Sequence, residues 1–232
     1  MGKLFSVSYF GNVIPKLLSA LPSTIGIVLA SLAFGLVLGF LAAALRIRGG
    51  PVMSRIAAFY ISFMRGVPLI ALMLLVYFGF PQLMSFLGFE AGSWPKYPLV
   101  IASFALNVSG YLAENMRSAY LSVDKSQFEA AHSIGMTGLQ GFVHIIFPQA
   151  VTNALPSVGN TVIMLIKDTA LAFSLGVVDI MGKAVLINAR NYGARQVEIF
   201  VAVGLIYWAV CFVLERILDL LEKRGRKPLR LG

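Results

Sequence analysis

The chain has 232 residues, of which 58% are hydrophobic and only 12% are charged. Soluble domains carry roughly 25% charged residues, so this composition excludes an ordinary soluble globular protein. The single cysteine and a mean hydropathy of +0.83 also exclude a disulfide-stapled secreted domain and a disordered tail. The net charge of +9 would suggest nucleic-acid binding in a soluble protein, but in a membrane protein it concerns orientation, and no nucleic-acid partner is expected.

Five apolar stretches are long enough to cross a membrane as helices, because a hydrocarbon core of ~30 Å needs about 20 apolar residues. They cover approximately residues 21–45, 56–80, 99–120, 150–177 and 198–221. The sequence therefore predicts an all-α membrane protein with five core transmembrane helices, forming one domain over residues 1–232. We expect the amino-terminal residues to belong to the mature protein, since they show no signal-peptide pattern.

The distribution of Lys and Arg between the predicted spans indicates the orientation. Eleven basic residues share the side of the carboxyl terminus: Arg46, Arg48, Arg55, Arg117, Lys125, Arg216, Lys223, Arg224, Arg226, Lys227 and Arg230. Six lie on the other side: Lys3, Lys16, Lys96, Lys183, Arg190 and Arg195. This excess predicts an external amino terminus and a cytoplasmic carboxyl terminus. Residues 122–147 then form a cytoplasmic loop, and residues 178–197 form an external one.

The cytoplasmic loop contains two capping-box patterns, Ser126 with Glu129 and Thr137 with Gln140. Between them, Gly135 is predicted to adopt the left-handed conformation that ends a helix. Four apolar residues follow at helical spacing as one stripe: Leu139, Phe142, Val143 and Ile146. The loop is thus predicted as two short amphipathic helices, which either cover the membrane surface or dock a partner.

A longer pattern includes this loop: Glu129-Ala130-Ala131, three residues, Gly135, nine residues, Ile145, two residues and Pro148. It resembles the EAA loop of the integral-membrane subunits of bacterial ABC importers, whose helix docks into a separate ATP-hydrolysing subunit. The resemblance implies that the ATPase-coupling residues are Glu129, Ala130, Ala131, Gly135, Leu139, Phe142, Ile145 and Pro148. Small side chains at positions 130 and 131 would let a partner surface approach closely. Phe147 stands where leucine is usual in the family.

Further segments resemble the polar amino-acid branch of this family, which takes up histidine, glutamine or cystine. They are Met64 to Leu69, Tyr77 to Gly79 with Pro81, and Lys167 to Leu171. The resemblance implies a type I ABC importer fold in the bacterial cytoplasmic membrane. It also implies a second permease subunit, identical or paralogous, two copies of an ATPase subunit, and an extracytoplasmic amino-acid-binding protein. ATP and Mg would be bound by the ATPase, and this chain would bind no cofactor.

Several polar residues lie within the predicted spans, where a charge facing lipid costs ~2.5–3.5 kcal/mol on insertion scales. Asn107, Tyr111 and Glu114 share one helical face, which either lines a substrate path or ties helices together. Lys167 and Asp168 either form an internal ion-pair network or flank a gate at a dimer interface. These five residues are the candidate substrate-path residues.

The external segment 178–197 is too short and too polar to span the membrane. It is either a solvated loop or a partly helical surface that meets the binding protein.

No catalytic or metal site is expected. The chain has no phosphate-binding glycine loop followed by lysine, so we expect it not to be an enzyme and its energy to come from a partner. His132 and His144 have no cysteine nearby and are interpreted as loop surface. The alternative function is an ion-gradient-driven secondary amino-acid transporter that uses Glu114 or Asp168 as a proton-linked carboxylate.

Overall fold

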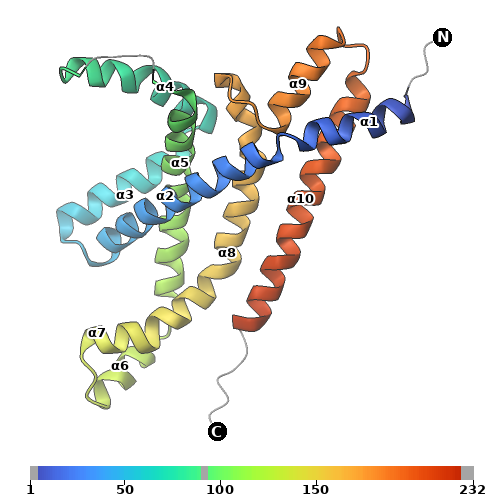
Figure 1. Cartoon of the computed structure of the whole chain (residues 1–232). Coiled ribbons are helices and arrows are strands. Elements are labelled where there is room, and N and C mark those ends of the chain that lie inside the picture. The colour runs from blue at the N-terminus through green and yellow to red at the C-terminus, as the bar shows by residue number, and fades with distance from the viewer. Residues whose placement is uncertain (1–4, 90–93, 226–232) are drawn as a thin grey trace. The chain divides into compact units, whose positions relative to one another are not determined.

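The computed structural model describes residues 5–89 and 94–225, and Figure 1 shows its helices. Within these ranges all regular secondary structure is helical, which confirms the predicted all-α class. The first helices are α1 (Val7–Leu18), α2 (Leu21–Arg48), α3 (Pro51–Gly66), α4 (Leu69–Phe86) and α5 (Lys96–Leu121). They are followed by α6 (Lys125–Ser133), α7 (Gly138–Gly141), the π-helical turn η1 (Phe142–Ile146), α8 (Phe147–Asp168), the 3₁₀ segment η2 (Thr169–Leu175), α9 (Ile180–Arg190) and α10 (Gln196–Gly225).

Four helical stretches among the described residues are long and apolar enough to cross a membrane: Leu21–Arg48, Leu69–Phe86, Gly138–Leu175 and Gln196–Lys223. At 26 residues, α5 also has the length of a span, although it carries several polar side chains. The prediction of one continuous span over residues 56–80 is wrong, because α3 ends at Gly66 and α4 begins at Leu69. Pro68 separates them, since proline has no N–H to continue the helical hydrogen bonds.

The described residues form two compact units. The first contains the chain up to Phe34, then Val67–Ala105 and Val162–Val213. The second contains Gly35–Gly66, Leu106–Thr161 and the chain from Leu214 onward.

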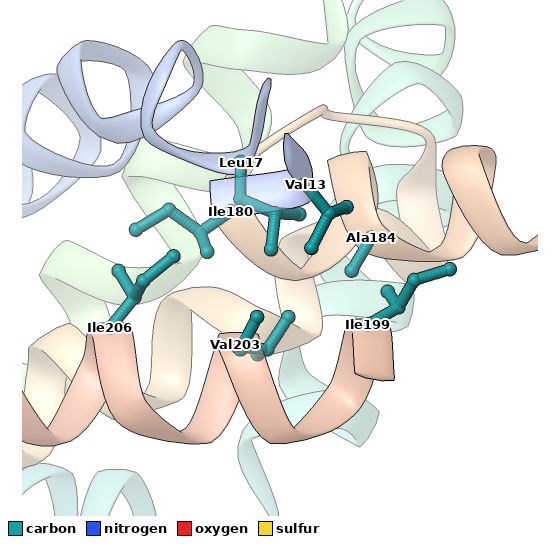
Figure 2. Packing of buried hydrophobic residues seen from close by; sticks show 8 residues of the cluster. Val13, Leu17, Ile180, Ala184, Ile199, Val203 and Ile206 are labelled. Carbon is teal, nitrogen blue, oxygen red and sulfur yellow. The ribbon is translucent and has the colours of Figure 1, made fainter. Parts of the chain in front are cut away.

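The core of the first unit joins α1, α9 and α10 (Figure 2). Each helix contributes apolar residues four positions apart, which places them on one face. The fully or almost fully buried members include Val13, Leu17, Ile180, Ala184, Ile199 and Val203. This packing gives the short helices α1 and α9 a fixed place against the long helix α10.

Asp179 anchors the start of α9 and is completely buried. Its carboxylate accepts a hydrogen bond from the Gly182 backbone N–H at 2.8 Å and another from the Tyr207 hydroxyl of α10 at 2.7 Å. Within segment 178–197, Ile180–Arg190 is therefore a packed helix, so the solvated-loop alternative is wrong for this part. Its contact with a binding protein stays a prediction.

The second unit is built around close approaches to α5. An added Cβ at Gly110 would lie 2.8 Å from the Cβ of Met64 on α3, so a larger residue at this position would push the two helices apart. Nearby, Ala42, Ala43, Ile61 and Ala113 form a cluster of mostly small buried side chains. Small residues are what allow helix backbones to pack tightly where water supplies no hydrophobic drive.

Candidate functional site

Residues 124–146, here called the hairpin, contain α6, a turn, α7 and η1. Asp124 caps α6, and its carboxylate accepts a hydrogen bond from the Ser126 backbone N–H at 2.9 Å. This bond stabilises the charged carboxylate and lowers the pKa of Asp124. The predicted capping box of Ser126 and Glu129 is wrong, because both residues lie inside α6. Asp124 could have been recognised from the sequence, since aspartate is a favoured N-cap residue.

The turn after α6 follows the prediction for Gly135, whose φ is +78°. The Gly135 N–H donates to the His132 carbonyl at 3.0 Å, and the Met136 N–H donates to the Ala131 carbonyl at 3.1 Å. These two bonds form a Schellman motif, which satisfies the free carbonyls at the helix end. The left-handed glycine is thus confirmed, and the turn leaves α6 with a defined end.

The second capping box is also confirmed. The Thr137 hydroxyl accepts from the Gln140 N–H at 3.3 Å, and the Gln140 side chain accepts from the Thr137 N–H at 2.9 Å. The helix that begins here is not separate from the following span, because α7, η1 and α8 are consecutive. Pro148 lies in the first turn of α8 as delimited in the structure.

The apolar side chains of the hairpin divide into an inner and an outer set. Ala131 is 3% exposed and faces Gly141, where an added Cβ would lie 3.0 Å away, so this alanine packs the hairpin together. Ile146 is fully buried. In contrast, Ile134 is 72% exposed and Leu139 is 70% exposed. The predicted continuous stripe is therefore split, because the π-helical turn changes the spacing of side chains after Gly141.

The remaining predicted coupling residues lie on or near the hairpin surface. Glu129, Ala130, Gly135 and Pro148 are exposed, whereas Phe142 and Ile145 are half-buried. Exposed apolar side chains on a polar loop are available for contact with another molecule. The hairpin thus combines a stiff, hydrogen-bonded turn with an uncovered apolar surface.

Asn107 has a specific task at the break between α3 and α4. In a continuous helix the Met64 carbonyl would accept from the backbone N–H of residue 68, but that residue is proline. The Asn107 side-chain amide donates to the Met64 carbonyl instead, at 2.9 Å, and Asn107 is 6% exposed. Tyr111 acts one turn further along α5, where its hydroxyl donates to the Arg65 carbonyl at 3.4 Å. These contacts support the helix-tying alternative for Asn107 and Tyr111.

Glu114 pairs with Arg117 on the same helix. The two oxygens of its carboxylate accept from the guanidinium at 3.0 and 2.6 Å. Both side chains are 29% exposed. A two-bonded pair of this geometry fixes both side chains and compensates the charge of Glu114 within α5.

Lys167 and Asp168 belong to the other compact unit. Asp168 is the last residue of α8 and is half-buried, while Lys167 is exposed. Neither forms a salt bridge with another residue in the described ranges, so the structure does not support the ion-pair-network alternative.

Residues 35–227 match the family described as "Binding-protein-dependent transport system inner membrane component". The chain belongs to this family. Curated relatives are similar over nearly their whole lengths. The L-cystine transport system permease protein TcyL of Bacillus subtilis (strain 168) is 39% identical over 228 residues, which cover 98% of this chain and 94% of that protein. The probable amino-acid ABC transporter permease protein PatM of Vibrio harveyi is 38% identical, covering 92% of this chain and 93% of the relative.

The permease fold also matches solved structures. A crystal structure of an amino acid ABC transporter with histidines aligns with a TM-score of 0.84 and 28% identity, over 96% of this chain and all of the matched chain. The MetNI methionine ABC transporter in an inward-facing form aligns with a TM-score of 0.76 over 93% of this chain and 99% of the matched chain. At 16% identity the second match shows the fold alone. The predicted membrane-importer fold is therefore confirmed, and the chain is a multi-pass membrane permease subunit.

Proposed function

We propose that this permease is the transmembrane subunit of an ATP-driven importer that moves a polar or cystine-like amino acid across the cytoplasmic membrane by alternating access. The observation that carries the proposal is the hairpin, with its fixed turn at Gly135 and its exposed apolar side chains. The substrate class is supported by the relatives, which are named as permeases for L-cystine or amino acids. Which amino acid is carried depends on the binding protein as well as on the path.

Coupling through the hairpin has a physical requirement. A nucleotide-driven change in a partner shifts the equilibrium of the permease only through contacts that differ between the two states. A surface that docks such a partner must transmit displacement and not absorb it. The Schellman turn and the capping box hold α6 and α7 by four hydrogen bonds within a short segment, which supports this role.

The proposed complex contains two permease subunits, either identical or paralogous, and two ATPase subunits that bind ATP and Mg. An extracytoplasmic amino-acid-binding protein delivers the substrate. The amino terminus lies outside and the carboxyl terminus in the cytoplasm, as the distribution of basic residues favours. This orientation puts the hairpin on the side where ATP is available.

Among the five candidate path residues, Asp168 is the one that the structure best supports as a residue lining the substrate path. Asn107, Tyr111 and Glu114 have partners within their own unit. Asp168 is a half-buried carboxylate at the end of a span, and a carboxylate there can attract the ammonium group of an amino acid. Lys167 carries the opposite charge on a different face of α8, so we propose that it contacts the path separately.

The test is reconstitution of the permease with its ATPase and binding protein in proteoliposomes. We expect uptake of an amino acid to follow ATP hydrolysis and to be unaffected by an imposed proton or sodium gradient. The control replaces ATP with a non-hydrolysable analogue, which should abolish uptake. Uptake driven by an ion gradient without the ATPase would instead establish the secondary-transporter alternative.

A further inference from the structure

A cavity of about 420 Å³ lies within the second compact unit. Its walls come from the carboxyl-terminal parts of α2 and α5, from η1 and from the first half of α8. The lining includes Phe40, Ala43, Ala119, Phe142 and Ala154. The volume falls in the range of roughly 300–1,000 Å³ that is usual for small-ligand sites.

The lining excludes the proposed substrate as the occupant. Besides Arg48 and the Tyr120 hydroxyl, it consists of aliphatic and aromatic side chains. A zwitterionic amino acid placed there would lose its hydration without gaining partners for both of its charges, which is unfavourable. An alkyl chain has no such cost and gains from contact with the apolar walls.

Arg48 supplies a charge at this cavity. Its guanidinium lies 4.6 Å from the centroid of the Phe142 ring, which also lines the cavity. The side chain is exposed, and within residues 5–89 and 94–225 it forms no salt bridge. Stacking on an aromatic ring leaves the guanidinium N–H groups free to bind a phosphate oxygen.

The sequence segment that contains Arg48 carries further positive charges. Residues 46–55 contain Arg46, Arg48 and Arg55 and no acidic residue. On the proposed orientation, this segment faces the cytoplasmic leaflet, where anionic lipids attract basic residues. Two further lining residues, Phe147 and Val151, are 47% and 48% exposed, so the cavity has an apolar opening.

We propose that this cavity binds an acyl chain of an anionic phospholipid from the cytoplasmic leaflet, with the lipid phosphate at Arg48. The inference rests on the proposed orientation, but not on which substrate is carried. Because Phe142 belongs to the hairpin and Arg48 to α2, the bound lipid contacts both the span and the proposed coupling element. Anionic lipid would thereby stabilise one position of the hairpin relative to α2.

The test measures lipid retention and needs neither ATP nor transport. The full-length permease is purified in detergent and exposed to phosphatidylglycerol and phosphatidylcholine with identical acyl chains, and bound lipid is measured by native mass spectrometry. We expect the wild type to retain phosphatidylglycerol in preference to phosphatidylcholine. Arg48→Gln should reduce phosphatidylglycerol retention about fivefold, the factor that one basic residue near an anionic surface contributes, and leave phosphatidylcholine unchanged.

Two further variants separate the cavity from general electrostatics. Arg55→Gln removes a neighbouring exposed charge that does not line the cavity, and it should retain phosphatidylglycerol like the wild type. Ala154→Leu fills the cavity and should reduce retention of both lipids. If that variant fails to fold, the comparison of Arg48→Gln with Arg55→Gln still shows whether phosphatidylglycerol is retained specifically through Arg48.

Three results would overturn the proposal. The first is a wild type without lipid preference. The second is an Arg48→Gln variant that loses both lipids equally or behaves like Arg55→Gln, which would indicate a structural or a general surface effect. The third is a disulfide between two copies of Val151→Cys in a Cys211→Ala background, which would show that a second permease covers the opening. None of these results affects ATP-driven uptake in proteoliposomes, so the proposed function can be judged separately.

Discussion

The turn at Gly135 offers a graded test of the coupling hairpin. Its φ of +78° lies in the left-handed region, and an added Cβ would meet no atom within 4 Å. A substitution therefore introduces backbone strain without a steric clash. Placing an L-residue in this conformation costs roughly 1–2 kcal/mol, less for asparagine and more for a β-branched residue. We expect hairpin stability to fall in the order Gly135→Asn, Gly135→Ala, Gly135→Val.

The matched control is Gly138→Ala. Gly138 is exposed in the same hairpin, its φ is not positive, and an added Cβ also meets nothing within 4 Å. Because Gly138 is helical, alanine there should leave stability unchanged or raise it by about 0.5–1 kcal/mol. Any loss seen at position 135 but not at position 138 is then attributable to the backbone conformation.

The assay combines a local and a functional measurement. A cost of 1–2 kcal/mol changes the equilibrium for local opening of the turn by roughly 5- to 30-fold. Hydrogen exchange at the backbone amides of positions 135 and 136 should therefore accelerate by about that factor in Gly135→Ala. Co-purification of the ATPase and uptake should decline in the same order as protection. Wild-type uptake and normal ATPase association in Gly135→Val would refute the coupling role. Equal losses in Gly138→Ala would refute the conformational argument.

Three further predictions follow from the contacts. Asn107→Leu leaves the partly buried Met64 carbonyl without its donor, so the melting temperature in detergent should fall by the equivalent of about 0.5–1.5 kcal/mol. An altered substrate preference at unchanged stability would instead favour the path role. The pKa of Asp124 is lower in the folded hairpin, so its cap is fully present above the ordinary aspartate pKa and is lost as pH falls through the lowered value. Hydrogen-exchange protection of α6 should therefore fall on acidification in that window in the wild type, but not in Asp124→Asn. Equal pH dependence of protection in the two proteins would contradict this. The proposed orientation places Ala194 outside and Gly138 in the cytoplasm. In a cysteine-free background, an impermeant thiol reagent on intact cells should therefore label Ala194→Cys and leave Gly138→Cys unlabelled. The reverse labelling pattern would show that the orientation is the opposite.

The membrane class and the local form of the hairpin could be predicted from the sequence. Apolar stretches of about 20 residues indicate membrane helices because the bilayer itself imposes that length. The left-handed Gly135 and the Thr137–Gln140 capping box were predictable because each is completed by hydrogen bonds between residues at most five positions apart. The prediction of the first capping box was wrong because another local residue competes for the same position. Asp124 lies two residues before Ser126 and occupies the N-cap.

The tertiary structure decided what the polar residues of the spans do. Pro68 interrupts an apolar stretch, and the donor that replaces its missing N–H is Asn107, which lies 43 residues from the carbonyl it serves. No local pattern connects those positions, because the bond exists only once α5 packs against the end of α3. The same holds for Asp179, whose buried carboxylate accepts from Tyr207 on α10, 28 residues away. A buried polar group must find a partner, but which partner it finds depends on the helices that packing places around it.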